Sequence, residues 1–151
     1  MKTYVGVKQI QAKEMNRGDY NKYRGWTIPA DENPADEGYL VKYSDGYESW
    51  SPKKQFEEAY RECDNMTFGL AIEIMKKGKK VARKGWNGKG MFLFLAKSTD
   101  IETEADLTSC ENMHGDLVLP SIVRKTADNH FCVGWLASQT VILAEDWVVV
   151  E

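Results

Sequence analysis

Along the first third of the chain, the pattern of apolar and polar residues predicts a strand, a helix and a loop. Residues 4–15 alternate loosely between apolar and polar positions, which favours a strand. Residues 16–23 fit a short helix, because the Asn16 side chain can cap its first amides and Gly25 is a typical residue at a helix end. Residues 29–34 contain two prolines and three polar residues, a composition typical of a loop.

A β-hairpin and a second helix are predicted next. Residues 39–50 contain two β-prone runs on either side of an Asp-Gly pair, which favours a tight turn. Ser51-Pro52 is a typical start of a helix, and we expect this helix to be capped there and to run to about Arg61. We take residues 1–62 as a small β/α module.

The remaining pattern predicts a second unit over residues 66–151. Phe68, Met75 and the apolar residues between them recur at helical spacing, and Gly78 is a typical helix end. Residues 98–119 are polar and acidic, as expected of a loop. The later elements are strands over 81–83, 91–95, 121–126, 130–133 and 146–150, and a short helix over 138–143. The predicted fold class is α+β, with small antiparallel sheets and short helices, in which the N-terminal module precedes a C-terminal ligand-binding core.

Composition places the chain among soluble globular proteins. It has 151 residues, 42% of them hydrophobic and 11% aromatic, which is enough apolar area for a core without disulfides or metals. Its apolar runs are far shorter than the ~20 residues that span a bilayer. No secretory signal is visible at its start, and three cysteines in such a chain are expected to be reduced thiols. We therefore expect a cytoplasmic protein that does not associate with membranes.

Charge is segregated along the chain, although the net charge is only −3. Residues 66–97 carry eight basic side chains and one acidic side chain, whereas residues 98–151 carry two basic and ten acidic ones. A positive stretch inside an acidic chain suits a small anionic ligand, but the two parts could equally neutralise one another across the fold or a subunit contact. An isoelectric point near 5.5 argues against DNA or RNA as a partner.

The glycine-rich segment 85–90 is a candidate ligand-binding loop. Its three glycines allow backbone amides to approach a bound group, Trp86 offers a flat face for a base, and Asn87 can recognise a polar edge. Three nearby cations can neutralise phosphate: Arg83, Lys84 and Lys89. The segment is neither a Walker loop nor a dinucleotide fingerprint. It could also be an ordinary hairpin loop in which Trp86 covers the core.

Polar residues later in the chain add further candidates. Ser138 and Thr140 lie at the start of a predicted helix, where hydroxyls can bind an anion or simply cap the helix. Lys125 could meet phosphate or pair with an acidic neighbour. Asp146 could bind ribose hydroxyls or the amino edge of a base, while Asp128 could simply form a turn.

Metal and hydrolytic chemistry are weakly supported. Cys110 and His114 are separated by three residues, and His130 and Cys132 by one, which is poor spacing for a structural zinc site. We therefore expect no metal and no cofactor, and Cys132 fits better as a small core residue of a strand. A hydrolase that uses Asp146 with His130 is kept as an alternative, but neither histidine lies in a recognisable catalytic context.

Several blocks of the second unit together resemble one small phage-encoded family, the second type of Thoeris anti-defence protein. The blocks are Met66–Gly69, Lys79–Met91, Leu119–Ile122, Lys125–Asp128, Gly134–Thr140 and Leu143–Trp147. They occur in this order over residues 66–151. Residues 1–62 lie outside the resemblance and are similar to an N-terminal extension found on some longer phage members.

The resemblance implies a protein that sequesters cyclic nucleotide signals in the cytoplasm of the infected bacterium and does not cleave them. The implied ligands are the cyclic ADP-ribose isomers of TIR-based Thoeris defence and, for some members, the cyclic oligonucleotides of CBASS. It also implies a homotetramer with pockets at subunit contacts. The candidate ligand-binding residues are Phe68, Trp86 and Asn87 for base and ribose, Arg83, Lys84 and Lys125 for phosphate, and Thr126, Ser138, Thr140 and Asp146 for polar closure.

Two alternatives to this function remain open. The first is the nucleotide-signal hydrolase described above. The second is a phage protein-interaction module in which the 39–50 hairpin of the first module binds a protein partner.

Overall fold

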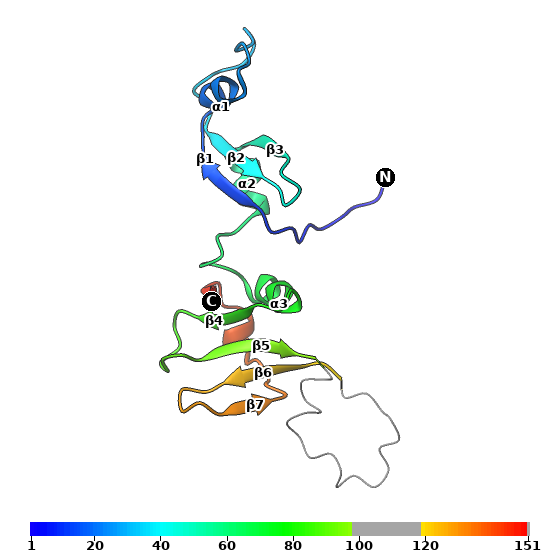
Figure 1. Ribbon diagram of the computed structural model, residues 1–151, viewed down its shortest axis with the longest axis vertical. Helices are drawn as coiled ribbons and strands as arrows, with labels where there is room; N and C mark the ends of the chain where they lie inside the picture. Colours follow the sequence, from blue (N-terminus) through cyan, green and yellow to red (C-terminus); the bar gives the residue numbers. More distant parts are fainter. Residues whose placement is uncertain (98–118, 151) are drawn as a thin grey trace. The chain divides into compact units, whose positions relative to one another are not determined.

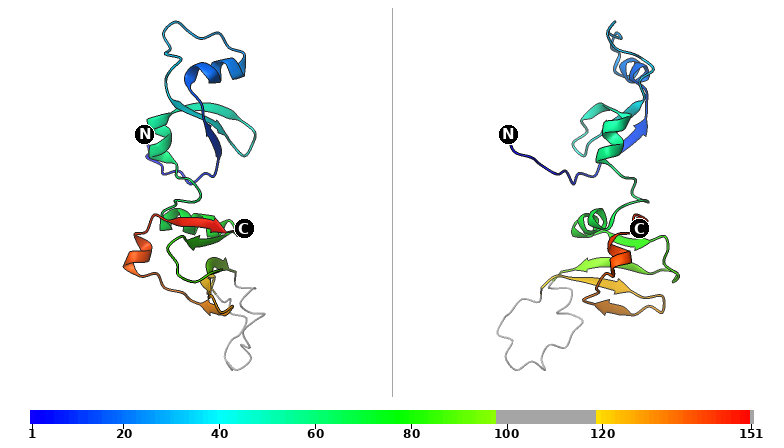
Figure 2. Two further views of the ribbon diagram at one scale, coloured as in Figure 1. Left: turned by 90° about the vertical axis from the view of Figure 1, so that its left-hand side faces the viewer. Right: turned by 180° about the vertical axis from the view of Figure 1, so that it is seen from behind.

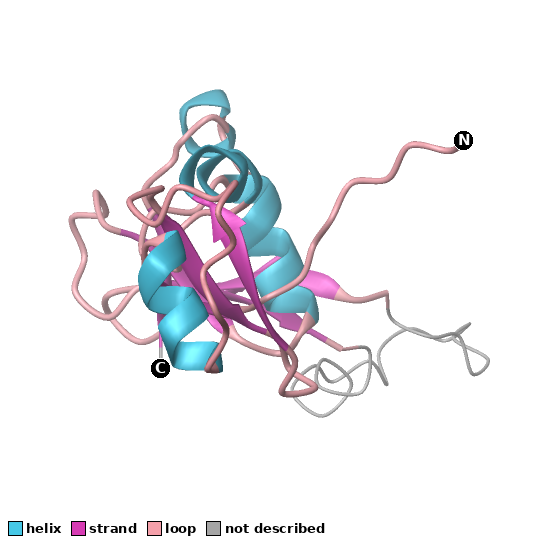
Figure 3. Ribbon diagram, turned by 90° about the horizontal axis from the view of Figure 1, so that it is seen from above, coloured by secondary structure: helices cyan, strands magenta, loops and turns pink. Residues whose placement is uncertain are grey.

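The computed structural model describes residues 1–97 and 119–150, and it divides into two compact units, Met1–Arg61 and Glu62–Glu151 (Figure 1). Both units place short helices beside antiparallel strands, so the predicted α+β class is confirmed (Figure 3). Among the described residues, no helix has the length and apolarity needed to cross a bilayer.

The N-terminal unit is a three-stranded antiparallel sheet with two helices. In spatial order the strands are β1 (Gln11–Glu14), β2 (Gly38–Lys42) and β3 (Glu48–Pro52), and the helices are α1 (Arg17–Arg24) and α2 (Lys53–Ala59). The ends of α1 confirm the sequence prediction. The Asn16 side chain accepts a 2.7 Å hydrogen bond from the Asp19 amide, and Gly25 closes the helix in the left-handed conformation with a φ of 69°.

Two expectations for this unit are wrong in part. The strand expected over residues 4–15 is paired only from Gln11, opposite Lys42, because β2 ends there and the hairpin turn begins. Ser51 does not cap α2, since Pro52 occupies the cap position and makes no side-chain capping bond. The helix ends at Ala59, before Arg61.

A buried polar network fastens the 29–34 loop to α1. Asn21 is almost fully buried and donates a 3.0 Å hydrogen bond to Glu32, and Arg17 pairs with the same carboxylate through its Nε at 2.7 Å. These donors lower the pKa of Glu32 from 4.5 to about 2, the Arg17 bond having the larger effect and the Asn21 bond the next. On its other side, the Arg17 guanidinium lies over the Trp50 ring. The loop is therefore held by charge as well as by packing.

The C-terminal unit is a five-stranded antiparallel sheet with two helices. In spatial order the strands are β7 (Phe131–Val133), β6 (Ser121–Lys125), β5 (Phe92–Ala96), β4 (Lys80–Arg83) and β8 (Trp147–Val150), and the helices are α3 (Phe68–Lys76) and α5 (Gln139–Ile142). Figure 2 shows β8, in red, beside β4 in its left panel. These elements are the ones that the pattern of apolar residues predicts. The acidic segment 98–119 falls almost wholly outside the described residues.

The core of this unit lies between α3 and one face of the sheet. Thr67 caps α3 through its hydroxyl, and the helix buries Ala71 and Met75 against Val81 and Leu93 of the central strands. Trp147, at the start of β8, is fully buried in the same cluster. Apolar burial of this kind supplies most of the stability of a small domain.

Cys132 is not the core residue that the sequence suggests. It is exposed as a free thiol, and Cys63 is also exposed and free. The physical reason is the place of β7, which pairs only with β6 at the edge of the sheet and has all three residues exposed.

The Glu32 network predicts an acid-dependent loss of stability in the N-terminal unit. Because its folded pKa lies below the unfolded value, Glu32 contributes stability above the usual carboxyl range, and this contribution is lost as the pH falls toward about 2. Glu32→Gln should remove this part of the pH dependence, measured by urea unfolding followed on the amide resonances of α1. Asp31→Asn, which removes the neighbouring carboxylate, should behave as wild type. Equal pH slopes for wild type and Glu32→Gln would contradict the account.

Candidate functional site

Figure 1 shows the segment that joins β4 to β5. One carboxylate holds the start of this segment. Asp146, which precedes β8, accepts a 2.6 Å hydrogen bond from Arg83 Nε on Oδ1 and a 3.0 Å bond from the Gly85 amide on Oδ2. Its backbone carbonyl accepts the Lys84 amide at 3.1 Å. We call Asp146 and these three donors the Asp146 clamp. It fixes three consecutive residues at the start of the loop.

The electrostatics of the clamp favour an ionised carboxylate. The Arg83 guanidinium lowers the pKa of Asp146 below its usual value, and the Gly85 amide adds to this effect. A Cβ atom at position 85 would lie 3.1 Å from Asp146 Oδ2, so a larger residue there would push against the clamp carboxylate. Arg83 and Asp146, predicted as separate ligand contacts, are therefore partners of one another.

Aromatic rings surround the next residue of the loop. Trp86 is half-buried and meets Trp147 and Trp135 edge-on, with ring centroids 5.6 and 6.4 Å apart. Phe68, at the start of α3, lies 5.1 Å from Trp147 and 6.3 Å from Trp135. We call these four residues the aromatic cluster. Trp86 packs against the core, as the alternative interpretation of the loop expects, and its contact with a ligand stays a prediction.

The far end of the loop meets the turn between β6 and β7. A Cβ atom on Gly88 would lie 2.3 Å from Met91 Sδ and 3.0 Å from Ala127 Cβ, so a larger residue there would displace the Met91 side chain. Lys125 donates a 3.3 Å hydrogen bond to the Gly90 carbonyl, and within residues 1–97 and 119–150 it forms no ion pair. The Lys125 ammonium also lies over the Phe92 ring. The loop is thus supported at both ends.

The polar residues beyond the loop have local partners. Thr126 bonds with Asp128 and with the His130 backbone, which makes Asp128 a turn residue. Ser138 and Thr140 lie 3.0 Å apart, hydroxyl to hydroxyl, at the start of α5. The Ser138 side chain makes no capping bond, so capping of α5 by its hydroxyl is a wrong expectation.

Much of the positive charge near the loop is neutralised within the unit. Arg83 pairs with Asp146, and Lys84 pairs with Asp64 and bonds to Asn65. In the part of the chain that the structure describes, Lys89 makes no ion pair. Lys89 and Asn87 are both exposed in the loop. Of the polar side chains in this loop, these two are available to a ligand.

Sequence reasoning missed Trp135 as a member of the site. The structure places its ring between Phe68 and Trp86, although it lies 49 residues after Trp86 in the chain. The signal that could have found it is the Gly-Trp pair that recurs at both positions. Asp64, the partner of Lys84, was missed because nothing local indicates it.

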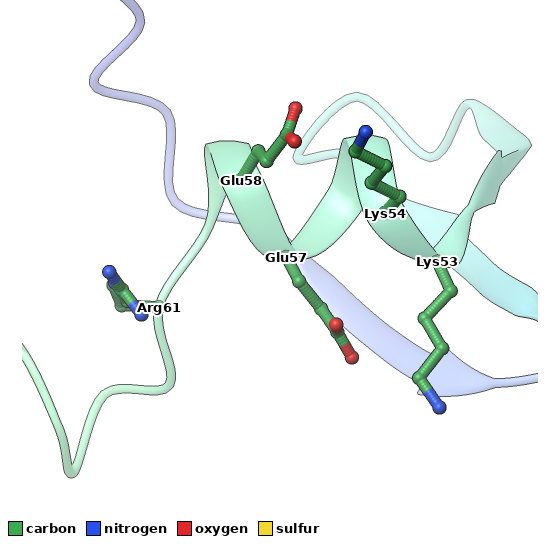
Figure 4. Close-up of a pocket in the computed structure, with 5 residues that line it drawn as sticks. All are labelled: Lys53, Lys54, Glu57, Glu58 and Arg61. Carbon is green, nitrogen blue, oxygen red and sulfur yellow. The ribbon is translucent and has the colours of Figure 1, made fainter.

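Two hollows lie in the N-terminal unit. One, of about 630 Å³, follows α2 and is lined by Lys53, Lys54, Glu57, Glu58 and Arg61. Figure 4 shows these side chains pointing in different directions. The other, of about 370 Å³, adjoins the start of α1 and has Glu14, Asp19 and Glu37 in its lining. Charged side chains of both signs that point apart are typical of a solvated helix surface. The first hollow therefore does not suggest a binding site.

Comparison with known proteins identifies the C-terminal unit. The model of the Thoeris anti-defense 2-like domain matches residues 66–150. A curated relative named Thoeris anti-defense 2, from Bacillus phage SP01, is 44% identical over 86 residues, which is 57% of this chain and 96% of the relative. Together with the five-stranded sheet and its loop, these matches define a phage anti-defence protein. The chain belongs to the Thoeris anti-defense 2-like family.

Proposed function

We propose that this protein binds cyclic nucleotide immune signals, foremost cyclic ADP-ribose isomers, and sequesters them without cleavage in the cytoplasm of the infected bacterium. Membership of an anti-defence family supports the biological role. The observation that carries the binding proposal is the loop itself. It is fixed at both ends, yet it leaves Asn87 and Lys89 exposed beside the half-buried Trp86.

The chemistry of the loop suits such a ligand. A cyclic ADP-ribose isomer offers a flat base, ribose hydroxyls and a pyrophosphate. Stacking on an aromatic ring contributes ~1–3 kcal/mol, and a charge-assisted hydrogen bond contributes ~1.5–3 kcal/mol. A sequestering protein that competes at nanomolar concentration needs about 12 kcal/mol. A few such contacts on a loop that is already ordered can approach this value, because little ordering entropy is lost on binding.

The ion pairs in the structure change which cations we assign to the phosphate groups of the ligand. Arg83 and Lys84 would have to leave Asp146 and Asp64 in order to reach a ligand. Among the described residues Lys89 forms no ion pair, and Lys125 donates to the Gly90 carbonyl and lies over the Phe92 ring. We therefore assign the phosphate contacts to Lys89 and Lys125, and the base and ribose contacts to Trp86 and Asn87 with Phe68 behind them. Thr126, Ser138 and Thr140 remain candidates for polar closure.

The hydrogen-bond partners of Asp146 and His130, the two residues that a hydrolase would use, favour a non-catalytic role. Asp146 is occupied by Arg83 and Gly85, and it is therefore a poor general base. His130 pairs with Asp128 at 3.1 Å on an exposed turn. A hydrolase would therefore need Asp146 to leave these donors and His130 to act from a solvent-exposed turn.

Assembly into a homo-oligomer, a tetramer by family resemblance, is part of this proposal. On β5, Phe92 and Phe94 alternate with the fully buried Leu93 and so lie on the other face of the sheet. Phe131, on the edge strand, meets Phe94 at 6.0 Å and is 53% exposed, and Val133 is 56% exposed. An apolar sheet face that ends in an exposed edge suits a second copy of the chain.

The binding proposal predicts which loop variants lose affinity. Asn87→Ala and Lys89→Ala should each weaken binding of a cyclic ADP-ribose isomer by about tenfold, because each removes one polar or charged contact. Their melting temperatures should stay near that of wild type, since both side chains are exposed. The measurement is isothermal titration calorimetry. Lys79→Ala, which removes an exposed lysine elsewhere in the positive stretch, is the control and should bind normally. Wild-type affinity in both loop variants would contradict the assignment.

The assembly proposal predicts the effect of charge on the exposed edge. Phe131→Lys combined with Val133→Lys should reduce the molar mass in light scattering to that of one chain, because charged side chains would be buried at the contact. Val5→Lys, at a valine of the N-terminal unit that is 91% exposed, should leave the assembly intact. A wild-type protein that is already monomeric, or a double variant that still assembles, would show that this surface does not mediate assembly.

A further inference from the structure

We propose that Asp146 is a positioning residue, which holds the 85–90 loop in its binding conformation from behind and never touches the ligand. This inference rests on the proposed function as far as ligand affinity is concerned. The claim that one carboxylate controls the loop conformation rests only on the observed contacts.

Each acceptor oxygen of Asp146 has a partner at the start of the loop. Oδ1 accepts from Arg83 Nε, Oδ2 accepts from the Gly85 amide, and the backbone carbonyl accepts from the Lys84 amide. The Asp146 side chain is about 30% exposed and that of Arg83 about 20%. Turning either side chain toward a ligand would break this partly buried ion pair and leave the other charge without its partner, which is unfavourable.

The clamp connects the loop to paired strands and to a fully buried core residue. Arg83 is the last residue of β4 and pairs in register with Trp147, the residue after Asp146, which is fully buried. The Trp86 amide bonds to the Arg83 carbonyl at 3.2 Å, so the tryptophan follows directly from the clamped residues. The position of Trp86 and of the exposed Asn87 therefore depends on where Asp146 holds the backbone of Gly85.

An electrostatic role and a positioning role of Asp146 predict opposite changes in ligand affinity when the carboxylate is removed. Neutralising Asp146 would leave the Arg83 cation without its partner beside the loop, and a purely electrostatic role would then strengthen the binding of an anion. A positioning role predicts weaker binding, because the loop loses its fixed conformation and must be ordered when the ligand binds. The direction of the change separates the two roles.

The test compares Asp146→Asn with two matched variants of the full-length protein. Glu145→Gln removes the neighbouring exposed carboxylate and makes the same change in net charge. Val149→Ala removes apolar contacts that β8 makes with the core, so it lowers stability without touching the clamp. Hydrogen exchange of the 85–90 amides is measured by NMR in the absence of ligand. The affinity for a cyclic ADP-ribose isomer is measured by calorimetry.

The clamp predicts a specific combination of results. In Asp146→Asn, exchange of the loop amides should accelerate at least about tenfold relative to the β5 amides, and affinity should fall about tenfold. Glu145→Gln should change neither quantity, and Val149→Ala should lower the melting temperature while leaving the affinity unchanged. The double variant Arg83→Gln with Asp146→Asn should lose less affinity than the sum of the two single variants, because the two side chains act as one pair.

Failure of the clamp and failure of the proposed function give different results. Unchanged loop exchange in Asp146→Asn, or binding that is equal to or tighter than that of wild type, would overturn the positioning role. If wild-type protein binds no cyclic nucleotide, the proposed function fails. The exchange comparison with Glu145→Gln still decides in that case whether Asp146 controls the loop.

Discussion

The structure of the C-terminal unit depends on the packing of the buried residue Trp147. Its backbone pairs with Met66 on one side and with Arg83 on the other, and its indole fills the space between α3 and the sheet. The indole nitrogen also donates to the Val141 carbonyl of α5 at 3.4 Å. Through its backbone and its indole, this one residue thus contacts the start of the domain, the strand that precedes the glycine-rich loop and the short helix near the end. The residue just before it, Asp146, acquires a fixed position as a consequence.

This arrangement gives the positive segment of the chain two different uses. Two of its cations form ion pairs with acidic residues that are distant in the sequence. Arg83 pairs with Asp146, and Lys84 pairs with Asp64. Neutralisation within the fold therefore accounts for these two cations. The anionic-ligand interpretation stays a prediction, which now rests on Lys89 and Lys125. A loop that is fixed by neutralised charges can present its remaining polar groups without a large entropic cost.

Local signals were sufficient for most of the fold. Asn16, Gly25 and Thr67 act through neighbours within a few residues, and their caps form as the sequence predicts. The length of β1, the exposure of Cys132 and the pairing of Arg83 depend on partners distant in the chain, and no local pattern contains that information. The candidate site shows the same division, because the loop was found from its composition whereas its clamp and the role of Trp135 emerged only from the three-dimensional contacts.

The central claim is that the protein takes up a cyclic nucleotide and returns it chemically unchanged. The most direct measurement is to incubate the purified protein with a cyclic ADP-ribose isomer, remove unbound ligand by filtration, denature the complex by heat and identify the released molecule by mass spectrometry. The account predicts stoichiometric recovery of the intact cyclic compound. Recovery of a linear or hydrolysed product would show that the protein is an enzyme, and no retained nucleotide at all would show that this fold does not bind the proposed signal.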